Sequence, residues 1–83
     1  MTEGTLLVTG GAGFIGSNFV RPAIALDRSV ITLDALTYAG NRANLAPVMD
    51  DARHTFVEGS IADQSTVTRI IAEHRPSAIV NFA

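Results

Sequence analysis

The chain has 83 residues, of which 47% are hydrophobic and 17% are charged, and its formal net charge is −2. This composition predicts one small folded domain rather than a disordered chain, and the charge gives no reason to expect nucleic acid or an anionic membrane as a partner. The absence of cysteine excludes disulfides and thiolate metal sites, so that no metal is expected.

No apolar run approaches the roughly 20 residues of a membrane span. The first residues also lack the basic and apolar regions of a signal peptide. We therefore expect a soluble, cytoplasmic protein. All six basic residues are arginines, so any chemistry that requires a lysine cannot be completed within this sequence.

Apolar, β-prone segments alternate with helical ones along the chain. Strands are expected at residues 5–9, 29–34, 55–58 and 77–82, and helices at 14–26 and 63–75, with a loop and a short helix before the third strand. Asp63 is placed to cap the second long helix, and Pro76 to end it. Pro22 lies inside the first helix, which we expect to be kinked or interrupted there.

Strands that are apolar nearly throughout indicate a parallel sheet with helices on both faces. Right-handed crossovers then favour a Rossmann-like, doubly wound α/β arrangement with strand order 3-2-1-4. Such a domain has about six strands when complete. We therefore expect residues 1–83 to be the N-terminal part of a longer cofactor-binding domain, without its substrate domain.

Four glycines, Gly10, Gly11, Gly13 and Gly16, lie between the first strand and the first helix. Without Cβ atoms the chain can turn tightly, approach a pyrophosphate closely and pack the helix on the sheet. The start of the helix also offers free N–H groups and a partial positive charge to phosphates. The spacing predicts a dinucleotide site, the alternative being a structural turn, whereas a P-loop is excluded because it requires lysine.

Asp34 ends the second strand, 18 residues after Gly16. A carboxylate at this place can accept hydrogen bonds from the adenosine ribose and would repel a 2′-phosphate, which favours NAD over NADP. FAD and S-adenosylmethionine stay open, because their binding proteins share these features. The alternative for Asp34 is a solvated acid. His54 and His74 are too isolated to form a site, and we expect each at the surface or its boundary.

The run LLVTGGAGFIGSNFV strongly resembles the extended short-chain dehydrogenase/reductase family of nucleotide-sugar enzymes. The run LDALTYAGNRANL is similar to the dTDP-glucose 4,6-dehydratases of that family, and the final VNFA resembles the strand that leads into the family's substrate loop. The resemblance covers essentially the whole chain. It implies a longer, homodimeric lyase that uses bound NAD to oxidise C4 of a nucleotide sugar such as dTDP-glucose, eliminates water across C5–C6 and returns the hydride.

Two alternatives stay open beside this interpretation. One is another NAD-dependent sugar-nucleotide enzyme, such as a UDP-sugar 4-epimerase. The other is a non-catalytic dinucleotide-binding module or remnant. The family's Tyr-x-x-x-Lys pair is expected beyond Ala83, because Tyr38 is followed four residues later by Arg42. We therefore expect no catalytic residue in the chain and no activity from these 83 residues alone.

The resemblance also implies which residues surround the NAD. They shape the turn (Gly10, Gly13, Gly16), meet the pyrophosphate (Phe14, Ile15), surround the adenosine ribose (Asp34, Ala35, Leu36, Thr37), lie by the adenine (Ser60, Ile61) and start the wall by the nicotinamide ribose (Phe82, Ala83). At Ser60 the family usually has an aspartate that accepts from the adenine amino group. A neutral hydroxyl accepts a weaker hydrogen bond than a carboxylate, so adenine affinity should be lower here.

Overall fold

Four parallel strands form a single sheet in the order β3-β2-β1-β4. The structure is a computed structural model and describes residues 4–36 and 41–82. The strands are β1 (Thr5–Thr9), β2 (Ser29–Asp34), β3 (His54–Glu58) and β4 (Ala78–Asn81). The predicted order 3-2-1-4 is confirmed, and the fold is Rossmann-like α/β.

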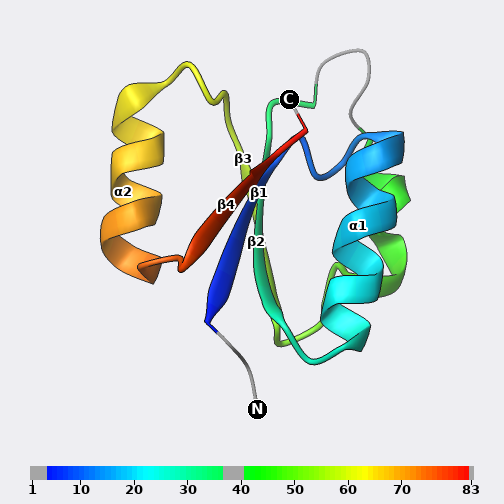
Figure 1. The fold of residues 1–83 in the computed structure, drawn as a ribbon. Coiled ribbons are helices and arrows are strands. Elements are labelled where there is room, and N and C mark those ends of the chain that lie inside the picture. Colours follow the sequence, from blue (N-terminus) through cyan, green and yellow to red (C-terminus); the bar gives the residue numbers. More distant parts are fainter. Residues whose placement is uncertain (1–3, 37–40, 83) are drawn as a thin grey trace.

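Helices cover both faces of this sheet (Figure 1). Helix α1 (Phe14–Ala25) and the 3-10 helix η1 (Arg42–Val48) lie on one face, and α2 (Gln64–His74) lies on the other. This is the doubly wound arrangement that the alternation of segments predicts. Among residues 4–36 and 41–82, no helix is long and apolar enough to span a membrane.

The two central strands are buried on both sides, which explains why apolar residues point to both faces of each strand. Alternate residues of β1 and β2 contribute to two separate cores. The core under α1 and η1 includes Leu6, Val8, Val20, Ile24, Val30 and Leu45. The core under α2 consists of Leu7, Ile31, Leu33 and Ile70, with Val57 and Val67 packed against it.

The ends of the helices follow from particular residues. Asp63 is the N-cap of α2 and accepts a hydrogen bond from the Thr66 N–H, as predicted. Arg75 then ends α2 in the left-handed region, with φ +46°, directly before Pro76. Of the two outcomes expected at Pro22, a kink or an interruption, the interruption is wrong, since α1 continues to Ala25. Pro22 has no N–H to donate to the Asn18 carbonyl, but the hydrogen bonds of the last turn remain, since the Leu26 N–H donates to the Pro22 carbonyl at 3.0 Å.

His54 does not lie at the surface or its boundary, as the sequence suggested, but is 7% exposed. It is the first residue of β3 and pairs in register with Val30 of the central strand β2. Its ring therefore lies on the face of the sheet that α1 and η1 cover, as Val30 does. Its Nε2 atom lies 2.8 Å from the Thr32 Oγ1 atom. His74, at the end of α2, is exposed.

Candidate dinucleotide-binding site

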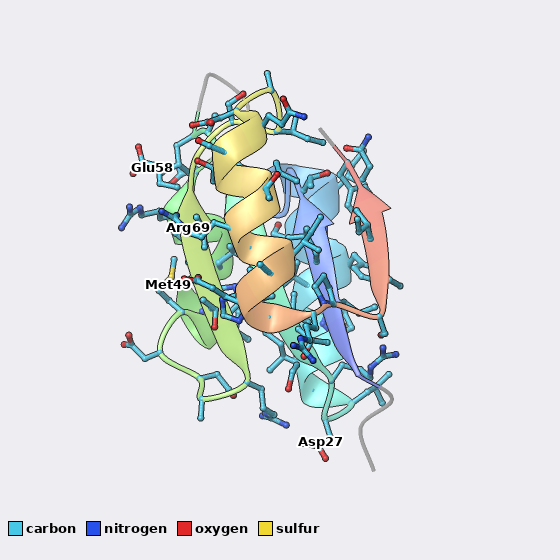
Figure 2. All side chains as sticks on the ribbon, turned by 90° about the vertical axis from the view of Figure 1, so that its left-hand side faces the viewer. Asp27, Met49, Glu58 and Arg69 are labelled. Carbon is cyan, nitrogen blue, oxygen red and sulfur yellow. The ribbon has the colours of Figure 1, made fainter. Side chains whose placement is uncertain are left out.

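The four strands run in the same direction, so their carboxyl ends meet at one edge of the sheet, where α1 begins (Figure 1). Figure 2 labels Glu58, the last residue of β3, near this edge and Asp27 near the opposite one. In open α/β sheets, ligands bind outside the carboxyl ends of the strands at the point where the strand order reverses. Here that point lies between β1 and β4, because the chain crosses from β3 at one edge of the sheet to β4 at the other.

Backbone hydrogen bonds hold the segments that leave this edge close to the sheet. The Gly10 N–H donates to the Leu33 carbonyl at 2.8 Å, and the Phe82 N–H donates to the Thr9 carbonyl at 2.8 Å. The Gly59 N–H donates to the Asp34 carbonyl at 3.0 Å. The segments after β1, β3 and β4 are therefore fixed relative to one another.

The turn between β1 and α1 is tight enough to exclude side chains. Gly10 has φ +71°, a conformation that L side chains rarely adopt. A Cβ atom added to Gly16 would lie 2.3 Å from the Gly10 carbonyl oxygen and 2.9 Å from the Gly11 Cα atom. A Cβ atom on Gly11 would lie 2.6 Å from the Thr32 methyl carbon. Two of the glycines thus allow helix and sheet to approach this turn.

Gly13 differs from these glycines. It is the N-cap of α1 with φ −71° and ψ 170°, a conformation that any residue adopts, and no described side chain caps the helix at this place. The first N–H groups of a helix have no acceptor within the helix. The side chains that follow, Phe14 and Ile15, are 76% and 70% exposed. The start of α1 therefore presents backbone donors and two exposed apolar side chains.

Asp34 is 8% exposed, so its interpretation as a solvated acid is wrong. Its Oδ2 atom accepts a hydrogen bond from the Ala12 N–H at 2.9 Å, and its Oδ1 atom accepts one from the Leu36 N–H at 2.8 Å. A carboxylate oxygen accepts up to two hydrogen bonds, so each oxygen keeps capacity for a hydroxyl donor. The acid is therefore part of the glycine turn itself.

The segment after β2 is also tied to the turn, through residues that sequence analysis did not single out. The Ala12 carbonyl accepts from the Asn41 N–H at 3.1 Å and from the Asn44 Nδ2 atom at 2.8 Å. The Asn41 side chain in turn caps η1 by accepting from the Ala43 N–H at 2.9 Å. An asparagine directly before a helical segment is a signal for such a cap, whereas nothing in the sequence indicates the role of Asn44. Thr37 lies outside the described residues.

The remaining predicted residues lie on the segments after β3 and β4. Ser60 is exposed, and its Oγ atom accepts a hydrogen bond from the Ala62 N–H at 3.0 Å. Ile61 is 47% exposed. The Phe82 ring packs against the Phe19 ring of α1, with 5.6 Å between centroids. Ala83 lies outside the described residues.

Arg42 is the first basic residue after Asp34, and its charge is already paired. One of its guanidinium nitrogens lies 2.9 Å from the Glu58 carboxylate, and the guanidinium carbon lies 4.9 Å from the centroid of the Phe56 ring. Both charged side chains are more than half exposed, so the pair contributes little to stability. The ion pair nevertheless holds the side chain of Arg42, the first residue of η1, against β3.

The glycine turn, the start of α1 and Asp34 together match the parts of an adenine dinucleotide. Gly16 and Gly11 keep side chains out of the turn, the uncapped start of α1 offers donors to a pyrophosphate, and Asp34 offers acceptors to a ribose. The fold and this site define a Rossmann-like domain of the dinucleotide-binding class.

The chain belongs to the NAD dependent epimerase/dehydratase family, whose sequence model matches residues 6–83. A dTDP-glucose 4,6-dehydratase of Xanthomonas campestris is 56% identical over 79 residues, which cover 95% of this chain and 22% of the relative. Among solved structures, the dTDP-glucose 4,6-dehydratase of Bacillus anthracis in complex with NAD has a TM-score of 0.91 and 43% identity, covering 95% of this chain and 26% of that one.

A UDP-glucose 4-epimerase of Thermotoga maritima, solved with UDP-glucose, is also similar, with a TM-score of 0.83 and 39% identity over 95% of this chain and 24% of that one. The chain therefore spans about a quarter of the length of the relatives it matches.

Proposed function

We propose that these residues form the NAD-binding part of a nucleotide-sugar dehydratase that resembles the dTDP-glucose 4,6-dehydratases. The observation that carries the proposal is the buried Asp34 carboxylate, which accepts from the Ala12 N–H inside the glycine turn. An acceptor for the ribose and the donors for the pyrophosphate thus belong to one hydrogen-bonded unit. The high identity to dehydratases supports the choice of enzyme.

Each part of the site has a defined task in this proposal. The backbone of Phe14 and Ile15 binds the pyrophosphate at the start of α1. Asp34 binds the ribose hydroxyls, and its negative charge disfavours a 2′-phosphate. Arg42, the first cation along the chain after Asp34, is paired with Glu58, which further favours NAD over NADP.

The other residues predicted to contact NAD lie on the segments after β3 and β4, outside the glycine turn and Asp34. Ser60 and Ile61 would lie beside the adenine, and Phe82 beside the nicotinamide ribose. The exposure of Ser60 and Ile61 at the carboxyl edge supports this assignment. The contacts of Thr37 and Ala83 stay predictions, as do the homodimeric state and the cytoplasmic location of the whole protein.

The residues of this chain bind and orient the cofactor and do not carry the acid–base chemistry. Bound NAD supplies the reversible oxidation of a sugar carbon. The chain has no lysine, so a Tyr-x-x-x-Lys pair has to come from outside these 83 residues. We accordingly expect no turnover of a nucleotide sugar by these residues alone.

A UDP-sugar 4-epimerase is the second candidate for the whole protein. The similarity to the Thermotoga maritima epimerase supports this candidate, since 95% of this chain matches a part of that enzyme, which was solved with UDP-glucose. Both candidates use an NAD site of this kind, so the choice between them depends on the residues that contact the sugar. The higher identity to the Xanthomonas campestris dehydratase favours the dehydratase.

The proposal is tested by titrating NAD and NADP into the chain and into Asp34→Asn by calorimetry. Losing a charged acceptor that faces the ribose removes about 1.5–3 kcal/mol, so the dissociation constant for NAD should rise by about 10- to 100-fold. NADP affinity should fall less, because the repulsion of its 2′-phosphate is removed as well. Asp50→Asn, at an exposed aspartate in the turn after η1, is the matched control and should bind NAD as the parent does.

Two results would contradict the proposal. One is no binding of NAD by the folded chain at millimolar concentration. The other is an equal loss of NAD and NADP affinity in an Asp34→Asn variant whose circular dichroism matches that of the parent. A charge that faces the ribose has to distinguish the two dinucleotides.

A further inference from the structure

A buried polar pair lies directly beneath the glycine turn and is not among the residues assigned to the cofactor. The Thr32 Oγ1 atom and the His54 Nε2 atom are 2.8 Å apart, and the two residues are 0% and 7% exposed. They come from neighbouring strands, β2 and β3, on the face that α1 and η1 cover. Buried polar groups of this kind fix the arrangement around them, because breaking the hydrogen bond leaves both partners unsatisfied.

Thr32 connects this pair to the turn. A Cβ atom on Gly11 would lie 2.6 Å from the Thr32 Cγ2 atom and 3.2 Å from its Oγ1 atom, so the Thr32 side chain packs against the Gly11 backbone. A threonine side chain has few χ1 positions, and its hydrogen bond selects one of them. Turning the Thr32 side chain would exchange methyl and hydroxyl at the contact with Gly11. The next residue, Ala12, donates to Asp34.

The other side of the His54 ring faces backbone groups of Val48 and Met49. Its Nδ1 atom is buried and makes no hydrogen bond to any described residue. Burial lowers the pKa of His54, while backbone groups of Val48 and Met49 and the Asp51 carboxylate oppose this without cancelling it. The charge of Asp51 is largely matched by Arg53, 2.8 Å away. Met49 lies beside β3 (Figure 2).

The charge of the ring decides what Thr32 can do. In a neutral imidazole one nitrogen donates and the other accepts, so the hydroxyl can adapt to either. In the charged ring both nitrogens donate, and the Thr32 hydroxyl can then only accept. Because burial lowers the pKa of His54, the ring is neutral at pH 7 and becomes charged below pH 6.5.

We propose that His54 is a positioning residue for the glycine turn: through its hydrogen bond it holds the Thr32 side chain against Gly11, and its charge state is transmitted to the Gly11 and Ala12 backbone. This inference deepens the proposed function, because it assigns a control element to the same NAD site. It requires no contact between His54 and the cofactor.

The experiment follows the amide signals of Gly11 and Ala12 by NMR between pH 7.5 and 5, without cofactor, in the 83-residue chain. Three variants accompany it. Thr32→Val keeps the methyl carbon against Gly11 and replaces the hydroxyl by a second methyl group. His54→Gln keeps a hydrogen-bonding group beside Thr32 but does not titrate in this range. His74→Gln alters the exposed histidine of α2 and is the matched control.

We expect the Gly11 and Ala12 signals to shift with the same midpoint as the His54 ring in the parent and in His74→Gln. The shift should disappear in His54→Gln and in Thr32→Val. Signals that stay in place while the His54 ring titrates would overturn the inference. So would a shift that is the same in Thr32→Val as in the parent. If His54→Gln does not fold, Thr32→Val still decides.

A second measurement uses NAD. The dissociation constant should rise by about 2- to 10-fold from pH 7.5 to 5.5 in the parent and in His74→Gln, the range that one hydrogen bond accounts for, and stay constant in His54→Gln. An equal rise in all three proteins would overturn the inference. If the NMR shifts occur but no protein binds NAD, the proposed function fails and the positioning role stands.

Discussion

Replacing Gly16 by alanine tests the packing of α1 against the glycine turn. Within a helix this substitution ordinarily stabilises a protein by about 1 kcal/mol, because glycine loses more backbone entropy on folding. At Gly16 the new Cβ atom would lie 2.3 Å from the Gly10 carbonyl oxygen and 2.9 Å from the Gly11 Cα atom. Both are backbone atoms, so the contact is relieved only by moving the helix away from the turn.

The magnitude follows from these opposing effects. Overpacking in a closely packed region costs about 1–3 kcal/mol, and a contact of 2.3 Å with backbone belongs at the upper end of this range or above it. After subtracting the gain in helix propensity, we expect Gly16→Ala to lower the free energy of unfolding by about 2 kcal/mol. For a domain of this size, this lowers the midpoint of thermal unfolding by about 10 °C.

Gly59→Ala is the matched control, because it makes the same chemical change in the segment after β3. There the added Cβ atom would lie 3.3 Å from the Thr66 Cγ2 atom and 3.4 Å from the Leu33 Cδ1 atom, which are side-chain atoms that can yield. Urea unfolding followed by circular dichroism should show a clear loss of stability in Gly16→Ala and little change in Gly59→Ala. Equal stabilities of the two variants would refute the packing argument, whatever their affinity for NAD.

Two further predictions concern the segment after β3. Asp63→Ala removes the cap of α2 and should lower the thermal midpoint at pH 7 by about 5 °C. Hydrogen bonds from Ser65 and Thr66 lower the pKa of Asp63. The contribution of Asp63 to stability is therefore present above pH 3.8 and is lost as the pH falls through the lower pKa of the folded state. A difference in thermal midpoint between parent and variant that is the same at pH 2 as at pH 7 would contradict this. Ser60→Asp should tighten NAD binding by about 3- to 10-fold, because a carboxylate accepts a stronger hydrogen bond from the adenine amino group and can still accept from the Ala62 N–H. An unchanged dissociation constant in calorimetry would argue against an adenine contact at this position.

The sheet could be predicted from sequence because its two central strands are buried on both faces. β1 has the apolar run Leu6–Val8 between glycines, and β2 has Val30, Ile31 and Leu33 between charged residues, so this pattern depends on local sequence alone. The cap at Asp63 is equally local, and it was predicted correctly. The 3-10 helix η1 was expected only as a short helix without bounds, because one or two helical turns produce no clear periodicity.

The glycine turn and Asp34 were recognisable because their spacing is fixed by the turn between a strand and a helix. The hydrogen bond from Ala12 to Asp34 was not, since it depends on how β2 lies beside β1. The same holds for His54, whose burial results from its register with β2 and from η1 above it. Long-range contacts of this kind leave no periodic signal in the sequence.

The peptide plane between Ala12 and Gly13 is held on both of its sides. Its carbonyl accepts from the Asn41 N–H and from the Asn44 Nδ2 atom, and its N–H donates to the Gly10 carbonyl at 3.2 Å. A peptide flip at this place would break three hydrogen bonds at once. The peptide between Ala12 and Gly13 is therefore ordered before any phosphate arrives, so that binding loses little free energy to ordering it and association needs no peptide flip.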